Sequence, residues 1–339
     1  MNRFLPDYND PIVSILMLLG IMFIVATLSY AYSIYKQNKR AKELLDFVDN
    51  FSSKECLLDT NSLNYEESMK KPLFLLAHAY LKSGEYSKSI NLYLYLLKHT
   101  KDEALLQHLA KAYLLAGFLK RSQGVYLEIL SKKPRDIDSL YKLELIYEKL
   151  SDINSAKDAL RVLKSQNQKV DRLLLHLEIL EITKSYLSRE KKFSLLVELL
   201  ETKEPKWAVL RELFKLDAKE AFNYYDDSYF KELVDVLYML NKENISFNIV
   251  QNYKNLTALY YLKGYIDTKE TSDIFAINLI ANAKSCGFDS GELGFIYICQ
   301  NCKNRYPLFF SRCPNCHRAY KIKTEVTVGK KVKRGKTLQ

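Results

Sequence analysis

Apolar residues recur three and four positions apart along most of the chain from residue 72 to about residue 285. This is the spacing of one face of an α-helix, so the pattern predicts a series of amphipathic helices. Glycine and proline, which interrupt helices, number only 10 and 7 among 339 residues, and their scarcity favours the same interpretation. We therefore predict an all-α fold for the body of the protein.

Three segments of this helical region align with one another. They are PLFLLAHAYLKSGEYSKSINLYLYLL from Pro72, ALLQHLAKAYLLAGFLKRSQGVYLEIL from Ala104 and DSLYKLELIYEKLSDINSAKDALRVL from Asp138. Leucines and a tyrosine recur in phase, at Leu73, Leu106 and Leu140, at Leu76, Leu109 and Leu143, and at Tyr80, Tyr113 and Tyr147. The steps of 33 and 34 residues are those of the tetratricopeptide repeat (TPR), a pair of helices. We predict three recognisable repeats in residues 72–165.

The third repeat departs from the other two at two positions. The first two have alanine where the helices of a repeat touch, and glycine where the first helix ends. The third has Glu144 and Ser151 at these places.

Beyond residue 165 the repeat pattern weakens, although the helical spacing continues. VDRLLLHLEILEITKSYL, FSLLVELLET, KWAVLRELFKL, YFKELVDVLYML and LTALYYLKGYI each predict a helix, and we interpret residues 166–290 as degenerate TPR-like helices. Repeats of this kind bury their apolar faces by stacking, which forms a helical solenoid with an extended concave surface. Such a surface binds peptides or proteins.

The first helix of each TPR lines the concave surface. The corresponding positions here are Lys71, Phe74, His78, Lys82, Gln107, Lys111, Tyr141 and Lys149. A basic and partly aromatic surface suits an acidic or mixed peptide, so we predict these residues as partner-binding. The alternative is that they are simply the solvated residues of their helices.

Residues 11–35, PIVSILMLLGIMFIVATLSYAYSIY, contain no charge. As a helix they extend about 37 Å at roughly 1.5 Å per residue, enough to cross a hydrocarbon core of about 30 Å. A signal peptide is the competing interpretation, but the apolar run is too long and Asp7 and Asp10 precede it. We predict a single transmembrane helix.

The charges that flank this segment predict its orientation. Lys36, Lys39, Arg40 and Lys42 follow it, whereas only Arg3 precedes it. By the positive-inside rule, residues 1–10 lie on the non-cytoplasmic side and the remaining chain is cytoplasmic, beginning with a juxtamembrane helical linker over residues 36–71.

Four of the six cysteines form two Cys-x-x-Cys pairs, Cys299 with Cys302 and Cys313 with Cys316, and ten residues separate the pairs. Each pair can bend into a tight turn, or knuckle, that presents two thiolates, and two knuckles complete a tetrahedron around a metal ion. In a reducing cytoplasm we expect metal ligands instead of disulfides, with a redox dithiol as the alternative.

We place this metal unit in residues 295–325, as a rubredoxin-like or zinc-ribbon fold with short β-strands. Tyr306, Leu308, Phe309 and Phe310 would shield the sulfurs, and metal binding would supply stability that so small a core lacks. We expect one zinc ion. Iron, which would allow electron transfer, is the alternative.

The formal net charge of +11 suits an anionic membrane, nucleic acid or an acidic protein, and does not choose among them. Part of it lies in a basic tail, residues 326–339. We weigh a solubilising role for this tail against contact with anionic lipid or nucleic acid.

Motifs of catalysis are absent from the sequence. It contains no Walker A loop, no G-x-S-x-G and no H-E-x-x-H. Cys56 and Cys286 are interpreted as packing residues, and His99 and His176 as surface or packing residues without an acid–base partner. We predict a binding protein that is not an enzyme, has no small-molecule substrate and has proteins, not nucleic acid, as its partners.

The order of these parts resembles the lipopolysaccharide assembly protein B (LapB, or YciM) family. The similarity is closest in YICQNCKNRYPLFFSRCPNCHRAYKIK, where the two cysteine pairs, their spacer, Pro314 and Tyr320 match that family's rubredoxin-type domain. Lys303 and His317 depart from it, because glycine commonly follows each knuckle. The polar prefix and the basic tail are further departures.

This resemblance implies an adaptor in the bacterial inner membrane. It would link an FtsH-type protease to an LpxC-type enzyme of lipid A synthesis and so regulate lipopolysaccharide synthesis. The rubredoxin-type domain would pack against the TPR array, with the four cysteines as metal ligands. The alternative is a TPR scaffold or chaperone for another membrane complex, such as transport or motility machinery.

Overall fold

The computed structural model describes residue 22 and residues 65–100, 102–288 and 290–330. The predicted membrane span lies outside these residues, apart from residue 22, and stays a prediction. None of the described helices combines the length and the apolar character that a membrane crossing requires. The chain divides into two compact units, Met1–Gly117 and Phe118–Gln339.

The described part of the first unit consists of helices. A short 3-10 helix, η1 (Glu67–Met69), precedes α2 (Lys70–Ser83), α3 (Tyr86–His99) and α4 (Glu103–Leu115). Helices α2 and α3 form a hairpin, and Gly84 between them has a φ of 85°. This left-handed conformation, which glycine adopts without strain, turns the chain from one helix into the next.

The second unit begins with eleven further α-helices. These are α5 (Leu119–Lys132), α6 (Ile137–Lys149), α7 (Ile153–Ser165), α8 (Asp171–Lys184), α9 (Arg189–Thr202), α10 (Lys206–Leu216), α11 (Ala218–Ala221), α12 (Phe230–Met239), α13 (Phe247–Val250), α14 (Lys254–Leu262) and α15 (Phe275–Ser285). Three short 3-10 helices, η2 (Phe222–Tyr224), η3 (Asp227–Tyr229) and η4 (Lys242–Asn244), lie among them. The described chain is thus a mostly helical, TPR-like solenoid.

Local sequence explains where several of these helices begin. The side chain of Asp136 accepts a hydrogen bond from the backbone N–H of Ser139 at the start of α6, and Asp152 accepts one from Ser155 at the start of α7. A carboxylate at this position satisfies a backbone donor that has no partner within the helix. At the end of α6, Ser151 adopts a left-handed φ of 62°, as glycine does at the equivalent positions of the first two repeats.

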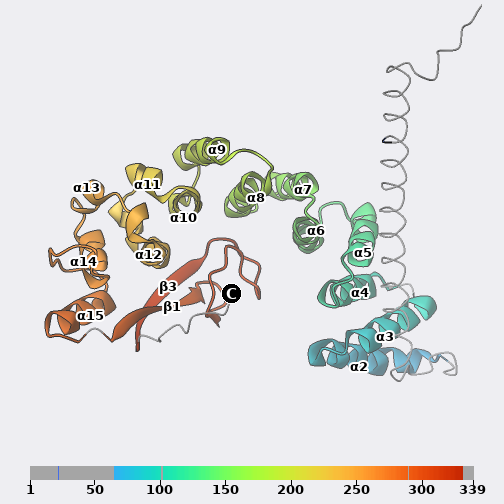
Figure 1. Ribbon diagram of the computed structural model, residues 1–339. Coiled ribbons are helices and arrows are strands. Elements are labelled where there is room, and N and C mark those ends of the chain that lie inside the picture. Colours follow the sequence, from blue (N-terminus) through green and yellow to red (C-terminus); the bar gives the residue numbers. More distant parts are fainter. Residues whose placement is uncertain (1–21, 23–64, 101, 289, 331–339) are drawn as a thin grey trace, which may run out of the picture. The chain divides into compact units, whose positions relative to one another are not determined.

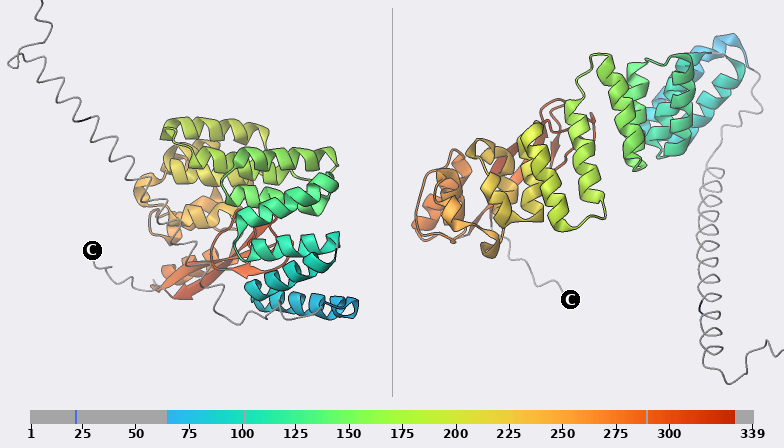
Figure 2. Two further views of the ribbon diagram at one scale, coloured as in Figure 1. Left: turned by 90° about the vertical axis from the view of Figure 1, so that its right-hand side faces the viewer. Right: turned by 90° about the horizontal axis from the view of Figure 1, so that it is seen from above.

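A three-stranded antiparallel sheet follows the helices. It contains β1 (Gly291–Cys299), β2 (Arg305–Tyr306) and β3 (Ile322–Lys330), in the order β2-β1-β3. Gly291 pairs with Lys330 and Cys299 with Ile322, so β3 continues into residues 326–330, which we had assigned to the tail. Figure 1 shows the strands on the inner side of the curve that α6 to α15 follow, and Figure 2 shows the same sheet from two other directions.

Candidate metal centre and its docking site

The two cysteine pairs lie in turns with the same backbone hydrogen bonds. In the first knuckle, the N–H of Lys303 donates to the carbonyl of Cys299 at 2.9 Å, and the N–H of Cys299 donates to Asn304 at 3.0 Å. In the second, the N–H of His317 donates to Cys313 at 3.0 Å, and that of Cys313 to Arg318 at 3.0 Å. Cys299 ends strand β1, so the sheet holds the first knuckle in place.

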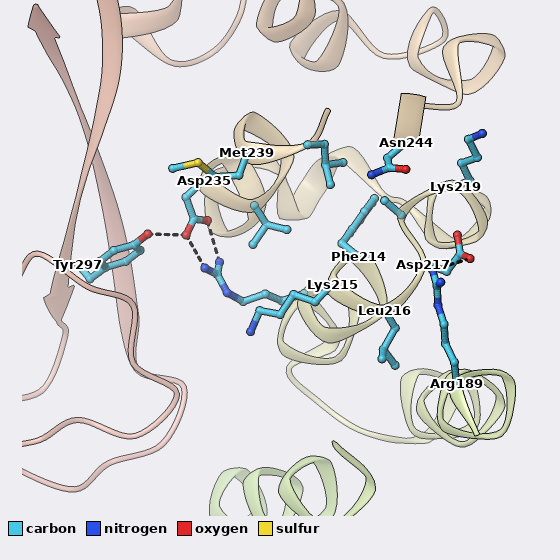
Figure 3. Close-up of a pocket in the computed structure, with 14 residues that line it drawn as sticks. Arg189, Phe214, Lys215, Leu216, Asp217, Lys219, Asp235, Met239, Asn244 and Tyr297 are labelled. Carbon is cyan, nitrogen blue, oxygen red and sulfur yellow. Dashed lines mark hydrogen bonds and ion pairs between the residues drawn. The ribbon is translucent and has the colours of Figure 1, made fainter. Parts of the chain in front are cut away.

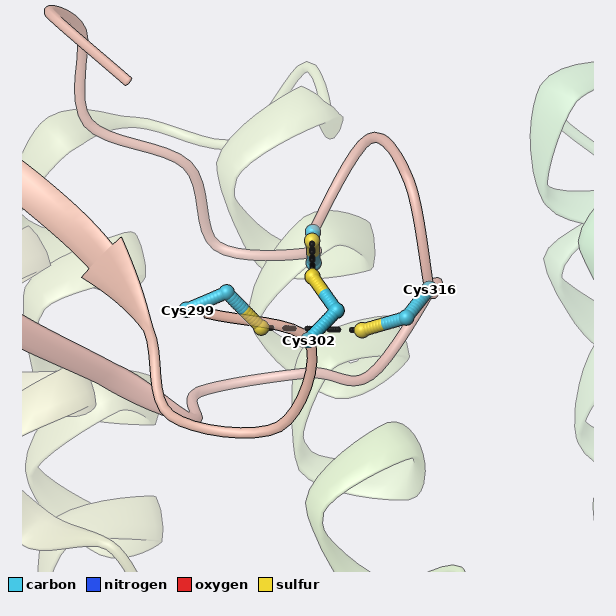
Figure 4. A group of neighbouring side chains, drawn as sticks. Cys299, Cys302 and Cys316 are labelled. Carbon is cyan, nitrogen blue, oxygen red and sulfur yellow. Dashed lines mark hydrogen bonds between the residues drawn. The ribbon is translucent and has the colours of Figure 1, made fainter. Parts of the chain in front are cut away.

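The four sulfur atoms form one cluster (Figure 4). All lie within 4.8 Å of one another, and the Sγ atoms of Cys299 and Cys316 are 3.5 Å apart, those of Cys302 and Cys313 3.7 Å. These distances are too long for disulfides, whose S–S bond is about 2.05 Å. Sulfurs placed about 2.3 Å from a central ion at tetrahedral angles would be about 3.8 Å apart. The cluster therefore fits a tetrahedral metal ion, and its ligand set suits zinc or iron.

The surroundings of the two cysteines in the first knuckle differ. Burial raises the pKa of the Cys299 thiol to about 12, so its thiolate needs a cation beside it. The backbone N–H of Asn304, directed at the sulfur of Cys302, lowers that pKa to about 6. A bound divalent cation would favour the thiolate at every position.

Lys303 and His317, which take the usual places of glycine, adopt left-handed φ values of 62° and 56°. The knuckle geometry is therefore formed without glycine, although an L-residue in this conformation is strained by roughly 1–2 kcal/mol.

The residues from Gly291 to Lys330, called the cysteine module below, dock on the helices through a buried ion-pair cluster. Arg312, beside the second knuckle, donates through Nη1 and Nη2 to the two oxygens of Glu144 at 2.8 and 2.7 Å, and it also contacts Glu148. Glu148 is 3.1 Å from Nε2 of His176 on α8. The side chains of Arg312, Glu144 and His176 are only 8%, 0% and 6% exposed.

The two carboxylates of this cluster respond differently to burial. Burial raises the pKa of Glu144 despite the neighbouring Arg312 guanidinium. Burial also opposes ionisation of Glu148, but its hydrogen bond with His176 and the charge of Arg312 outweigh it and lower the pKa to about 2. Glu148 is thus the carboxylate most firmly held in its charged form.

A second contact surrounds Tyr320, between the second knuckle and β3. Its ring packs edge-on against His176 and against Trp207 of α10, with centroid distances of 5.8 and 5.7 Å. Arg172 of α8 donates to the Tyr320 carbonyl at 2.8 Å. Tyr320 is 4% exposed, so its side chain is almost entirely buried between the module and the helices.

A third contact joins β1 to α10 and α12. Arg211 of α10 donates to both oxygens of Asp235 on α12, and the Tyr297 hydroxyl donates to Asp235 at 2.5 Å. Figure 3 shows Tyr297 reaching Asp235 from the sheet. The Arg211 guanidinium also lies 3.5 Å from the ring centroid of Phe309, a cation–π contact.

These contacts place the cysteine module against α6, α8, α10 and α12, the helices that a TPR array directs to its concave side. Of the predicted partner-binding residues, Tyr141 of α6 lies 5.8 Å beneath the guanidinium of Arg318, a residue of the module. Lys149 is exposed. In this unit the module itself occupies much of the surface that we had expected to be open to a partner.

The other predicted partner-binding residues lie in the first unit. Phe74 and His78 of α2 form an aromatic cluster with His108 of α4, at centroid distances of 4.9 Å from Phe74 to His108 and 6.1 Å from His78 to His108. Four polar residues, Lys71, Lys82, Gln107 and Lys111, are exposed on the same two helices. His108 was not predicted.

Sequence reasoning missed most of the docking residues. No sequence pattern marks Arg312, Glu148, Arg211, Asp235 or Tyr297. The prediction that His176 lacks an acid–base partner is wrong, because its ring contacts Glu148. One signal was available: Glu144, a charged residue at a repeat position that favours a small one.

No model of a known protein family matches the chain, and no curated protein matches it. Similar solved structures include a tetratricopeptide repeat protein from Parabacteroides merdae (16% identity, 73% of this chain and 98% of that one, TM-score 0.36). Others are kinesin light chain TPR-like repeats from Podosopora anserina (16%, 51% and 95%, 0.33) and the MamA RS-1 ArsTM double mutant (14%, 49% and 93%, 0.37). At these identities the likeness concerns the fold alone, and the LapB resemblance rests on the sequence.

Proposed function

We propose that this protein is a membrane-anchored scaffold that recruits other proteins. Its binding platform would be the described helices, α2 to α15, with the cysteine module as a structural part. The observation that carries the proposal is the docking of the module: the bidentate pair of Arg312 with Glu144, the hydrogen bond from Tyr297 to Asp235 and the buried ring of Tyr320 join it to the helices. These contacts support a structural role for the module.

Zinc is the metal that we propose for the cysteine site. A d10 ion without redox chemistry serves a site whose role is to hold two knuckles together. The purified protein should contain one zinc per chain and be colourless. Bound iron with a visible absorption band would instead favour electron transfer.

The finer proposal follows the LapB resemblance. Residues 11–35 anchor the chain in the bacterial inner membrane with its bulk in the cytoplasm, and the platform brings an FtsH-type protease to an LpxC-type enzyme. The outcome would be regulated lipopolysaccharide synthesis.

Affinity purification of the tagged full-length protein from solubilised membranes, with mass spectrometry of the captured proteins, tests this function. Capture of a membrane protease together with an enzyme of lipid A synthesis supports it. Capture of a different membrane complex would leave a scaffold with another role, such as transport or motility. Cys313→Ser with Cys316→Ser serves as the variant that should lose metal and partners while still inserting into the membrane.

A further inference from the structure

A pocket of about 610 Å³ opens in the second unit between α10, α11 and the end of α12 (Figure 3). Its volume falls within the range of about 300–1,000 Å³ that is usual for ligand sites. The pocket borders the docked module only at Tyr297, so it stays open while the module occupies the surface of α6 to α12.

The charges that line this pocket leave an excess of positive charge. Arg211 and Asp235 pair with each other, and Arg189 donates to Asp217 at 3.0 Å, so these four residues cancel. Two lysines remain among the lining residues. Lys215 pairs with Glu212 at 2.6 Å, a carboxylate outside the lining, whereas Lys219 forms no ion pair among the described residues, so Lys219 carries most of the excess.

Apolar side chains line the pocket beside these charges. They include the buried Phe214, together with Leu216 and Leu240. Met239, at the end of α12, is 63% exposed and belongs to the lining of the pocket. A thioether on a flexible side chain adapts to partners of varied shape.

We propose that this pocket binds an acidic peptide segment of a partner protein, with one apolar side chain seated against Met239 and Phe214 and carboxylates facing Lys215 and Lys219. Charge complementarity selects this occupant. The chain's own tail, residues 331–339, contains four basic residues and no acidic one, so its charge is of the wrong sign. The inference rests on the proposed scaffold function and assigns it a surface.

Fluorescence anisotropy on the full-length protein in detergent tests the proposal. The probe is a labelled peptide, Asp-Glu-Leu-Phe-Asp-Glu. We expect it to bind, to bind more weakly as salt is raised, and to lose about tenfold or more in affinity when Lys215→Glu and Lys219→Glu are combined. Met239→Asp should weaken binding similarly. Because all three side chains are exposed, these variants should fold.

Lys231→Glu is the matched control, since Lys231 is an exposed lysine of α12 that does not line the pocket. The Lys231→Glu protein should bind the acidic peptide with the same affinity as the wild type. The proposal is overturned if the acidic probe does not bind. It is also overturned if the basic peptide Lys-Arg-Leu-Phe-Lys-Arg, or the peptide Asp-Glu-Ser-Gly-Asp-Glu without apolar side chains, binds as tightly as the probe. A third contrary result is that unlabelled polyuridylate displaces the probe more effectively than unlabelled acidic peptide does.

The two proposals fail in distinguishable ways. If the pocket variants lose the peptide but capture partners as the wild type does, those partners do not bind at the pocket, the inference is overturned and the scaffold function stands. If the wild type binds the peptide but captures no protein from membranes, the scaffold function is wrong and the pocket stands as a peptide site.

Discussion

Glu144 has no exposed surface, and the guanidinium of Arg312 is its principal partner. A buried carboxylate is costly unless a charge and hydrogen bonds compensate it, and the bidentate geometry supplies both. Such a pair contributes less to net stability than to the choice of one arrangement over others, because removing both charges together is often neutral. We infer that the pair fixes where the cysteine module docks.

Replacing Arg312 alone should therefore be severe. We expect Arg312→Met to lower the stability of the second unit by about 3–5 kcal/mol, because it leaves Glu144 buried without a counter-charge. Trp207, the chain's only tryptophan, contacts Tyr320, so denaturant unfolding followed by its fluorescence measures the effect. The double variant Arg312→Met with Glu144→Met should recover most of the loss. Lys323→Gln, at an exposed residue of β3, is the control and should change stability by less than about 1 kcal/mol.

Ser151 offers a test of backbone strain at the same scale. Its φ of 62° is a conformation that glycine adopts freely, and we expect Ser151→Gly to stabilise the protein by about 1 kcal/mol. The change in unfolding midpoint measures this. Ser194→Gly, in the middle of α9, should instead destabilise by about 0.5 kcal/mol. A loss in both variants would mean that Ser151 is not strained.

At the scale of elements, the sequence predicted the long helices well. The five segments named in the degenerate region correspond to α8, α9, α10, α12 and α14 within a few residues, because each carries enough apolar positions to show the helical period. No segment was named for α15, although it has 11 residues. The short helices α11 and α13 have four residues each, too few for any period to appear. The docking contacts were out of reach for another reason: 168 residues separate Arg312 from Glu144, and a single sequence does not record which distant residues meet.

The end of the cysteine module was also beyond the sequence pattern. Residues 326–330 contain one basic residue, Lys330, and alternate apolar with polar or small side chains. They pair with β1 from Gly291 to Phe295, and Val326 packs against the core. Backbone pairing with β1, which a single sequence does not record, sets the end of the strand.

Two truncations test whether residues 326–330 belong to the tail or to the structural strand β3. A chain ending at Glu325 loses five of the residue pairs between β1 and β3, and we expect it to be less stable by about 2 kcal/mol or more. A chain ending at Lys330 keeps the whole strand and should unfold as the full-length protein does. Thermal unfolding of both proteins, with metal content recorded, makes the comparison. Equal midpoints would show that the last strand residues contribute nothing.

At the scale of the molecule, the metal site and the second unit form one structure. The module has a small core of its own, and its buried residues Tyr297, Phe310 and Tyr320 belong to the same apolar cluster as the helices from α6 onward. Metal binding is therefore expected to stabilise the helices as well as the knuckles, since binding energy at a site that folds with its ligand is folding energy.

Removing the metal should destabilise the cysteine module and also the helices that it contacts. After chelation we expect faster backbone hydrogen exchange in β1 and β3 and also in α6, α8, α10 and α12, because the helices lose Arg312, Tyr320 and Tyr297 as partners. Helices α2 to α4 belong to the other unit and should keep their protection. Adding zinc back should restore slow exchange in the wild type but not in Cys313→Ser with Cys316→Ser. If exchange rises in the strands alone, the module folds independently of the helices, and the metal does not support the platform.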